Sequence, residues 1–109
     1  MGYDLPAAIG IWAASRKDGA YSMGAAREGE DVILITGDGS IQMNLQELQT
    51  IIHHKMGIKI FIINNGGYHS IRQTQKNFFG EPLVGVGYDS GDLSFPDMEK
   101  LLLLMVILT

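Results

Sequence analysis

The stretch Val32-Ile33-Leu34-Ile35-Thr36-Gly37-Asp38-Gly39-Ser40 decides the fold of this chain. Its continuous run of apolar and β-branched residues is typical of a strand that is buried on both faces of a parallel sheet, and a turn is expected at Gly37-Asp38-Gly39. A second run, Ile58-Lys59-Ile60-Phe61-Ile62-Ile63, ends in Asn64-Asn65-Gly66-Gly67. The sequence therefore predicts strands over 32–36 and 58–63.

The segment between these strands predicts a helix. Asn44 stands three residues before Glu47, which is the spacing of an N-cap and its partner, and Leu45, Leu48, Ile51 and Ile52 then recur on one helical face. The helix should end near His54. Strand, helix and strand together form one βαβ unit, whose crossover should be right-handed.

Further helices should flank this unit. Asp4-Leu5-Pro6 begins an alanine-rich helix that should run to about Lys17, followed by a glycine-rich loop over 18–31. The polar segment 68–79 favours a short helix, and Ser94-Phe95-Pro96-Asp97 repeats the capping pattern before a last helix through Leu104. We expect an α/β fold, with a parallel sheet and flanking helices, and a chain of 109 residues that forms one domain.

Charge and composition exclude several classes of protein. The net charge is −4 and the eight Lys and Arg residues are scattered, so no basic surface is expected for nucleic acid or an anionic membrane. The absence of cysteine excludes disulfides and thiolate metal sites and suits a cytoplasmic location. The apolar run 101–108 is too short to cross a bilayer, and the N-terminus lacks the pattern of a signal peptide.

Polar loops follow both predicted strands. Ligands bind at the carboxyl ends of parallel strands, so Asp38 and Asn65 should face the same space. A carboxylate and an amide oxygen are ligands that Mg²⁺ accepts when phosphates complete its coordination. No Lys or Arg occurs between Val32 and Ile52, so a bound phosphate would need a metal and backbone N–H groups.

Two common phosphate-binding motifs are excluded. The dinucleotide fingerprint fails because Gln42 occupies the position of its third glycine, and the chain has no Gly-Lys-Ser/Thr sequence for a P-loop. Gly-Asp-Gly alone is a common turn. It gains meaning here because it follows a buried strand and is paired with Asn-Asn after the next strand.

The spacing of these loops resembles a known motif. Gly37-Asp38-Gly39-Ser40 and Asn64-Asn65, with 24 residues from Ser40 to Ile63, are similar to the thiamine-diphosphate motif of the superfamily of acetolactate synthases, pyruvate oxidases and decarboxylases. The segment 1–10 is similar to that superfamily's Met-Gly-x-x-Leu-Pro-Ala-Ala-Ile-Gly stretch. The resemblance, closest to the acetolactate synthase type, extends from Met1 to about Lys100 and identifies the C-terminal diphosphate-binding domain.

The resemblance implies a set of site residues. The side chains of Asp38 and Asn65 and the carbonyl of Gly67 would hold Mg²⁺, while Gly39 and Ser40 would contact the diphosphate of thiamine diphosphate. Met1 matches the bulky residue that bends the cofactor into a V shape. The full cofactor-binding set is Met1, Gly37, Asp38, Gly39, Ser40, Asn65, Gly67 and Tyr68.

The resemblance also implies an activity: condensation of 2-keto acids such as pyruvate with loss of CO₂, in branched-chain amino acid biosynthesis. Oxidase-like or decarboxylase-like chemistry is the alternative. Thr74 stands where acetolactate synthases carry a tryptophan that helps to select the acceptor, so the acceptor stays open.

The chain is expected to be incomplete as a catalyst. In the superfamily a glutamate from a pyrimidine-binding domain, usually on another subunit of an oligomer, assists proton removal, and this chain has no such domain, so no catalytic residue is assigned within it. Met1 matches an internal methionine, and Leu101 to Thr109 departs from the pattern, which indicates a truncated or frame-shifted reading frame. An inactive fragment that binds Mg²⁺ and diphosphate weakly is the second interpretation.

Other conspicuous residues have simpler interpretations. His53 and His54 suit the negative end of a helix dipole and should lie at the surface. His69 either faces the substrate or is solvated, and Trp12 should be mostly buried in the core. A polar helix face exposed to water explains Tyr68, Gln73 and Asn77 better than a role beside the site does.

Overall fold

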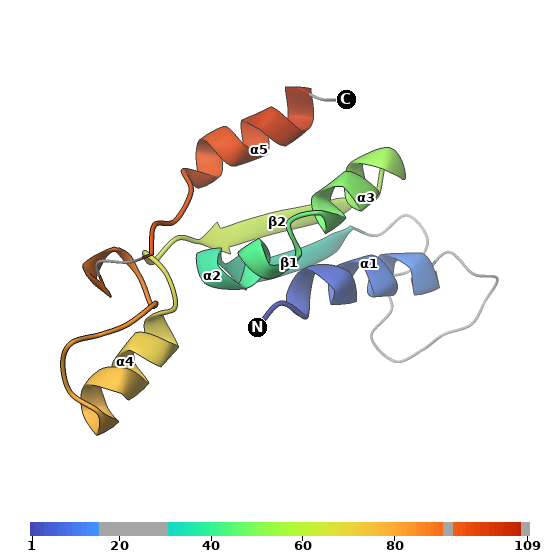
Figure 1. The fold of residues 1–109 in the computed structure, drawn as a ribbon. Coiled ribbons are helices and arrows are strands. Elements are labelled where there is room, and N and C mark those ends of the chain that lie inside the picture. The colour runs from blue at the N-terminus through green and yellow to red at the C-terminus, as the bar shows by residue number, and fades with distance from the viewer. Residues whose placement is uncertain (16–30, 91–92, 108–109) are drawn as a thin grey trace.

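The computed structural model describes residues 1–15, 31–90 and 93–107 (Figure 1). The helices are α1 (Asp4–Ser15), α2 (Asp38–Ile41), α3 (Glu47–His53), α4 (His69–Phe78) and α5 (Met98–Ile107), with short 3₁₀ helices η1 (Gln42–Asn44) and η2 (Tyr88–Ser90). The strands of the described residues are β1 (Val32–Gly37) and β2 (Ile58–Ile63).

The two strands pair in parallel, in a register that runs from Val32 opposite Ile58 to Gly37 opposite Ile63. The helical segments α2, η1 and α3 connect them, so the central unit is the predicted βαβ arrangement. The α/β fold with a parallel sheet and flanking helices is therefore confirmed.

The core lies between one face of the sheet and the helices α1 and α3, which Figure 1 shows across that face. The buried residues that form it come from five elements of the chain. They are Leu5, Ala8, Val32, Leu34, Ile41, Leu48, Ile51 and Met98. Trp12 packs against this cluster but is only half-buried, which is less than the sequence predicts.

The expected burial of β1 on both faces is wrong for the described structure. Val32 and Leu34 face the core, whereas Ile33 and Ile35 are 65% and 68% exposed. Phe61 on β2 is 56% exposed on the same outer face. Apolar residues on both faces show that a strand suits double coverage, but they do not determine whether a second layer is present.

The predicted turn and helix after β1 also differ from the structure. Gly37 is extended, with φ −88° and ψ 156°, and the chain enters α2 directly at Asp38 without an intervening turn. Asn44 is not the N-cap of the next helix, because α3 begins at Glu47 after Gln46, whose backbone is already helical and whose side chain forms no capping hydrogen bond. The amide of Asn44 instead donates to the carbonyl oxygen of Gly2.

The remaining helices agree with their predicted positions. The expected end of α1 at Lys17 and most of the loop over 18–31 lie outside the described residues. The predicted helix over 68–79 corresponds to α4, and the last helix begins at Met98. There, Lys100 N–H donates to the carboxylate of Asp97 at 3.2 Å, so Asp97 caps α5 in place of Ser94.

The molecule is a flat slab, with extents of 53 × 34 × 16 Å and a radius of gyration of 16.7 Å. A compact domain of this size has a radius of gyration of about 13 Å. Figure 1 shows the reason: α4 and α5 extend away from the sheet beyond the carboxyl ends of the strands and above it. Among the described residues no helix combines the length and apolarity that a membrane crossing requires.

Candidate functional site

The candidate site begins where both strands end. Gly37 and Ile63 are register partners, so the loops that follow β1 and β2 leave the sheet side by side. The first loop is the start of α2, and the second is Asn64 to Tyr68, which leads into α4. Residues 24 or more positions apart in the sequence are thereby brought together.

Asp38 joins these two segments. Its side chain is 1% exposed, and one carboxylate oxygen, Oδ2, accepts the N–H groups of Gly66 at 3.0 Å and Gly67 at 2.9 Å. The other oxygen, Oδ1, accepts the N–H of Gly39 at 2.8 Å. These backbone donors hold the buried carboxylate in place. Because Oδ1 accepts the N–H of Gly39, its second lone pair can accept a further partner.

Three polar atoms converge here: Oδ1 of Asp38, one atom of the Asn65 amide and the carbonyl oxygen of Gly67. The inward atom of the Asn65 amide lies 3.1 Å from Asp38 Oδ1 and 2.9 Å from the carbonyl oxygen of Gly67, and in the structure that atom is oxygen. Oxygens this close repel unless a proton or a cation lies between them. The amide meets this need either by turning its NH₂ inward to donate to both oxygens, or by keeping its oxygen inward around a cation.

The spacing fits a small, hard cation. Mg²⁺ binds oxygen at 2.0–2.1 Å in an octahedron, so neighbouring ligand oxygens lie about 2.9–3.0 Å apart. Within the described ranges no cluster of three His, Cys, Asp or Glu side chains exists. Ligation here would depend on one carboxylate, one amide and one main-chain carbonyl.

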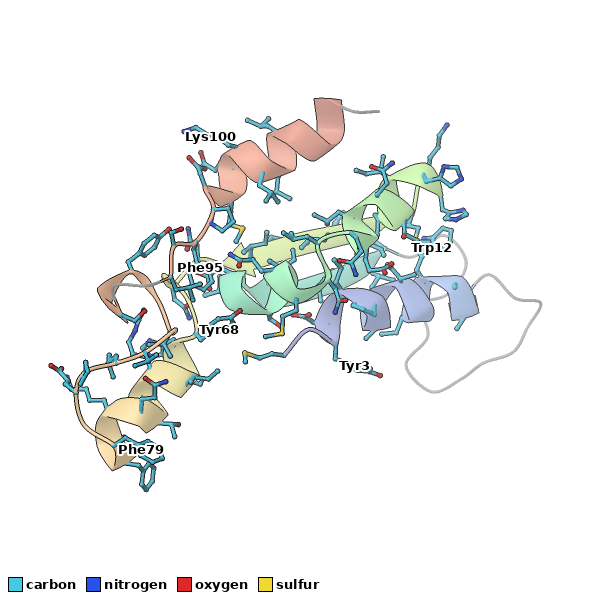
Figure 2. The ribbon with its side chains drawn as sticks, viewed as in Figure 1. Tyr3, Trp12, Tyr68, Phe79, Phe95 and Lys100 are labelled. Atoms are coloured by element: carbon cyan, nitrogen blue, oxygen red, sulfur yellow. The ribbon has the colours of Figure 1, made fainter. Side chains whose placement is uncertain are left out.

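Two glycines are required by close packing at the site. Gly67 has φ +120°, and a Cβ there would lie 2.5 Å from the carbonyl oxygen of Val86 and 2.9 Å from the ring of Phe95. At Gly39 a Cβ would lie 2.6 Å from the ring of Tyr68. Tyr68 in turn packs edge-on against Phe95, with ring centroids 5.4 Å apart. Figure 2 labels both side chains. These contacts fix the backbone on both sides of Asp38.

A pocket of about 170 Å³ opens in front of these residues. Complete ligand pockets usually measure about 300–1,000 Å³, so this one admits the end of a ligand such as thiamine diphosphate and not the whole. All the cofactor-binding residues predicted from the sequence line it. The lining is Met1, Gly37, Asp38, Gly39, Ser40, Asn65, Gly67, Tyr68, His69, Ser70 and Ile71.

Three of these lining residues, at the start of α4, were not in the predicted set. The sequence allows His69 either a substrate-facing or a solvated role, and in the structure its exposed side chain borders the pocket. Ser70 and Ile71 follow it along the first turn of α4. The sequence feature that points to these three residues is the polar loop that ends at Tyr68. This loop does not show which face of α4 points toward the pocket.

Arg72, on α4, holds the loop from Asn64 to Tyr68 in place. Its guanidinium donates to the carbonyl oxygen of Gly66 at 2.8 Å, next to Gly67. The pocket lining itself contains no Lys or Arg. An anion bound there would need a metal ion and backbone N–H groups, as the sequence predicts.

Several candidate residues lie away from the pocket. His53 and His54 are exposed at the end of α3, with rings 4.8 Å apart, so their predicted surface position is confirmed. Gln73, Thr74 and Asn77 are exposed on α4 and do not line the pocket. The hydroxyl of Thr74 donates to the carbonyl of Ser70, a local contact within the helix.

Together the fold and the pocket define an α/β protein with a pocket at the carboxyl ends of its parallel strands, which is where such folds bind ligands, and Asp38, Asn65 and Gly67 are part of its lining. The family model described as "Thiamine pyrophosphate enzyme, C-terminal TPP binding domain" matches residues 1–106. The chain belongs to this family, whose ligand is thiamine diphosphate, as the resemblance predicts.

Acetolactate synthases are among the similar proteins. The chain is 47% identical over 100 residues to the acetolactate synthase large subunit of Cyanidium caldarium, covering 92% of this chain and 15% of that protein. It is 38% identical over 95 residues to the acetolactate synthase of Arthrospira platensis, covering 87% and 14%. A pyruvate decarboxylase of Aspergillus parasiticus is 48% identical over 68 residues, covering 62% and 12%. The chain thus spans about one seventh of the length of these relatives.

Proposed function

We propose that this chain is the Mg²⁺- and diphosphate-binding domain of an acetolactate synthase-like enzyme. The observation that carries the proposal is the convergence of Asp38 Oδ1, the Asn65 amide and the Gly67 carbonyl at 2.9–3.1 Å. These three groups would form one side of a Mg²⁺ octahedron, and diphosphate oxygens and water would complete it.

The diphosphate would lie between this cation and the start of α2. The first turn of a helix has N–H groups without intrahelical acceptors. Asp38 Oδ1 already accepts the N–H of Gly39, so the other N–H groups of this turn, that of Ser40 among them, would be available to a phosphate oxygen. Met1 and Tyr68 line the same pocket and would contact the cofactor beyond its diphosphate.

When bound, thiamine diphosphate supplies the carbanion chemistry that acts on 2-keto acids. The residues of this chain would hold and orient its diphosphate end. The pyrimidine end, the 2-keto acid such as pyruvate, and the group that assists proton removal would require a pyrimidine-binding domain, in an oligomer of the full enzyme. We place the reaction in branched-chain amino acid biosynthesis in the cytoplasm.

A pyruvate decarboxylase-type reaction is the second candidate. The similarity to the Aspergillus parasiticus protein supports it, and the exposed Thr74 gives no contact that would select an acceptor keto acid. Mixing the chain with a pyrimidine-binding domain and pyruvate separates the two: acetolactate supports the first candidate, and acetaldehyde alone supports the second.

Calorimetric titration of the chain with thiamine diphosphate, with and without Mg²⁺, tests the binding proposal. We expect heat only when Mg²⁺ is present, and its loss in Asn65→Ala, which removes one ligand. Asn77→Ala is the matched control, because it removes an exposed amide from α4 outside the pocket.

Two results would contradict the proposal. Binding that does not depend on Mg²⁺ would show that the three oxygens do not act as metal ligands. Equal losses of binding in Asn65→Ala and Asn77→Ala would show that Asn65 has no specific part in the site. No heat from the unaltered chain would favour the inert fragment.

A further inference from the structure

The peptide group that joins Gly66 to Gly67 immediately precedes one of the three oxygens of the candidate site. Its backbone is permissive, because both residues are glycines with positive φ, +77° and +120°. Local sterics therefore restrict the orientation of this peptide little, and contacts from outside the loop must set it. The orientation matters because the next carbonyl along the chain, that of Gly67, belongs to the site.

Two side chains of opposite charge hold this peptide, one at each end. Its N–H, which belongs to Gly67, donates to Oδ2 of Asp38 at 2.9 Å. Its carbonyl oxygen, which belongs to Gly66, accepts a guanidinium N–H of Arg72 at 2.8 Å. The positive end of the peptide dipole thus faces a carboxylate and its negative end faces a cation. A flip of the peptide would break both hydrogen bonds and reverse both favourable interactions.

Asp38 connects this peptide to the candidate ion site. Its Oδ2 accepts the N–H groups of Gly66 and Gly67, so this oxygen faces the loop and Oδ1 is the one beside the Asn65 amide. A charged donor on the Gly66 carbonyl polarises the peptide and strengthens the Gly67 N–H as a donor to Asp38. Arg72 therefore acts on two of the three site groups, the Asp38 carboxylate and the Gly67 carbonyl.

The surroundings leave room for the guanidinium of Arg72 at this place. Arg72 is half-buried, and Gly87, which is buried, lies against it. A Cβ on Gly87 would collide with Nη2 of Arg72 and would lie 2.6 Å from the carbonyl oxygen of Gly66. Gly87 is also the antiparallel bridge partner of Gly67. The hydrogen bond from Arg72 to Gly66 is thus enclosed by the chain and is not a surface contact.

We propose that Arg72 is a positioning residue of the Mg²⁺ site. Arg72 does not line the pocket, so it acts through the Gly66–Gly67 peptide, which it holds in the orientation that Asp38 and the Gly67 carbonyl require. This inference rests on the proposed function for its ligand. The contacts of the peptide belong to the chain without cofactor and can be tested there.

Calorimetric titration with Mg²⁺ and thiamine diphosphate tests this role. Arg72→Met keeps a long unbranched side chain without a donor, and we expect binding about tenfold weaker, because loss of a group that orients a metal ligand typically costs about 10–100-fold in affinity. Arg72→Lys keeps a charged donor and should lose less. Lys76→Ala is the matched control, because it removes a positive charge one turn further along α4, outside the pocket lining.

Three results of the titration would overturn the proposal. Binding by Arg72→Met that equals binding by the unaltered chain would show that Arg72 has no part in the site. Equal losses in Arg72→Met and Lys76→Ala would show an effect of net charge alone. Equal losses in Arg72→Met and Arg72→Lys would show that the charged donor is not the group that matters.

Hydrogen exchange gives a readout that needs no cofactor and separates positioning from general stability. In Arg72→Met the exchange rate of the Gly67 amide should rise by a larger factor than that of Val32, whose N–H donates to the Gly57 carbonyl at 3.0 Å at the opposite end of the strands. Equal factors would show a merely structural role and overturn the proposal, as would an unchanged rate at Gly67. If the unaltered chain binds no cofactor, the proposed function fails, while this measurement still decides whether Arg72 holds the peptide.

Discussion

Asp38 and Asn65 are proposed to bind the same ion, but the structure predicts that their removal affects stability very differently. In Asp38→Ala the N–H groups of Gly39 and Gly67 lose a buried acceptor. Each buried N–H without a partner costs about 1–3 kcal/mol, so the variant should lose about 2–6 kcal/mol. A small domain has about 5–15 kcal/mol in total, so much of its stability depends on this one carboxylate.

Asn65→Ala should leave the fold nearly intact. The side chain is exposed, and in the metal-free chain its amide contributes at most the hydrogen bonds to Asp38 and Gly67. We expect a loss within about 1 kcal/mol, which shifts the unfolding temperature by about 4–8 °C or less. Binding of Mg²⁺-thiamine diphosphate should nevertheless disappear in both variants.

Thermal unfolding followed by circular dichroism, without Mg²⁺, measures the difference directly, and calorimetry measures binding in the same samples. Asn77→Ala serves as the control for both. The reasoning is refuted if Asn65→Ala and Asp38→Ala unfold alike, because the Asp38 carboxylate would then have no separate structural role. It is also refuted if Asn65→Ala binds Mg²⁺-thiamine diphosphate normally.

Three further predictions concern stability. Burial alone would raise the pKa of Asp4, but hydrogen bonds from Thr36, Ser40 and the Leu5 N–H lower this pKa below its ordinary 3.8. The stability that the Asp4 carboxylate contributes is therefore present above about pH 4 and is lost as the pH falls through its folded-state pKa. The unfolding temperature of Asp4→Asn should depend less on pH in that acid range, and an unchanged dependence would contradict this prediction. Gly67→Ala should cost at least about 2 kcal/mol because of its φ of +120° and the Val86 contact, and a variant as stable as the parent chain in urea would disprove the close packing. Ile35→Ala should change stability by less than about 0.5 kcal/mol, while Leu34→Ala should cost about 2–5 kcal/mol; similar losses in a urea titration would show that the outer face of β1 is covered.

The sequence predicts the strands and their polar ends well because both depend on local patterns. The apolar runs 32–36 and 58–63 mark the strands, and their parallel pairing places Asp38 and Asn65 at one edge. That proximity follows from topology and needs no knowledge of side-chain packing.

The parts that were missed depend on contacts across the chain. Asn44 has the spacing of an N-cap, but its amide is drawn to Gly2, 42 positions away, and α3 begins later without a side-chain cap. Asp4 looks like an ordinary helix-start residue, because nothing near it in the sequence indicates its hydrogen bond with Thr36, 32 positions away. Likewise, the pattern of β1 fits coverage on two faces, while the structure covers one.

The most direct test of the central claim is a crystal structure of the chain with Mn²⁺ in place of Mg²⁺ and with thiamine diphosphate, in which anomalous scattering locates the ion. We predict one ion bound simultaneously to Asp38 Oδ1, Asn65 Oδ1 and the Gly67 carbonyl at roughly 2.0–2.2 Å, with diphosphate oxygens completing its octahedron. An ion bound elsewhere, or a diphosphate held without any ion between Asp38 and Asn65, would contradict the account.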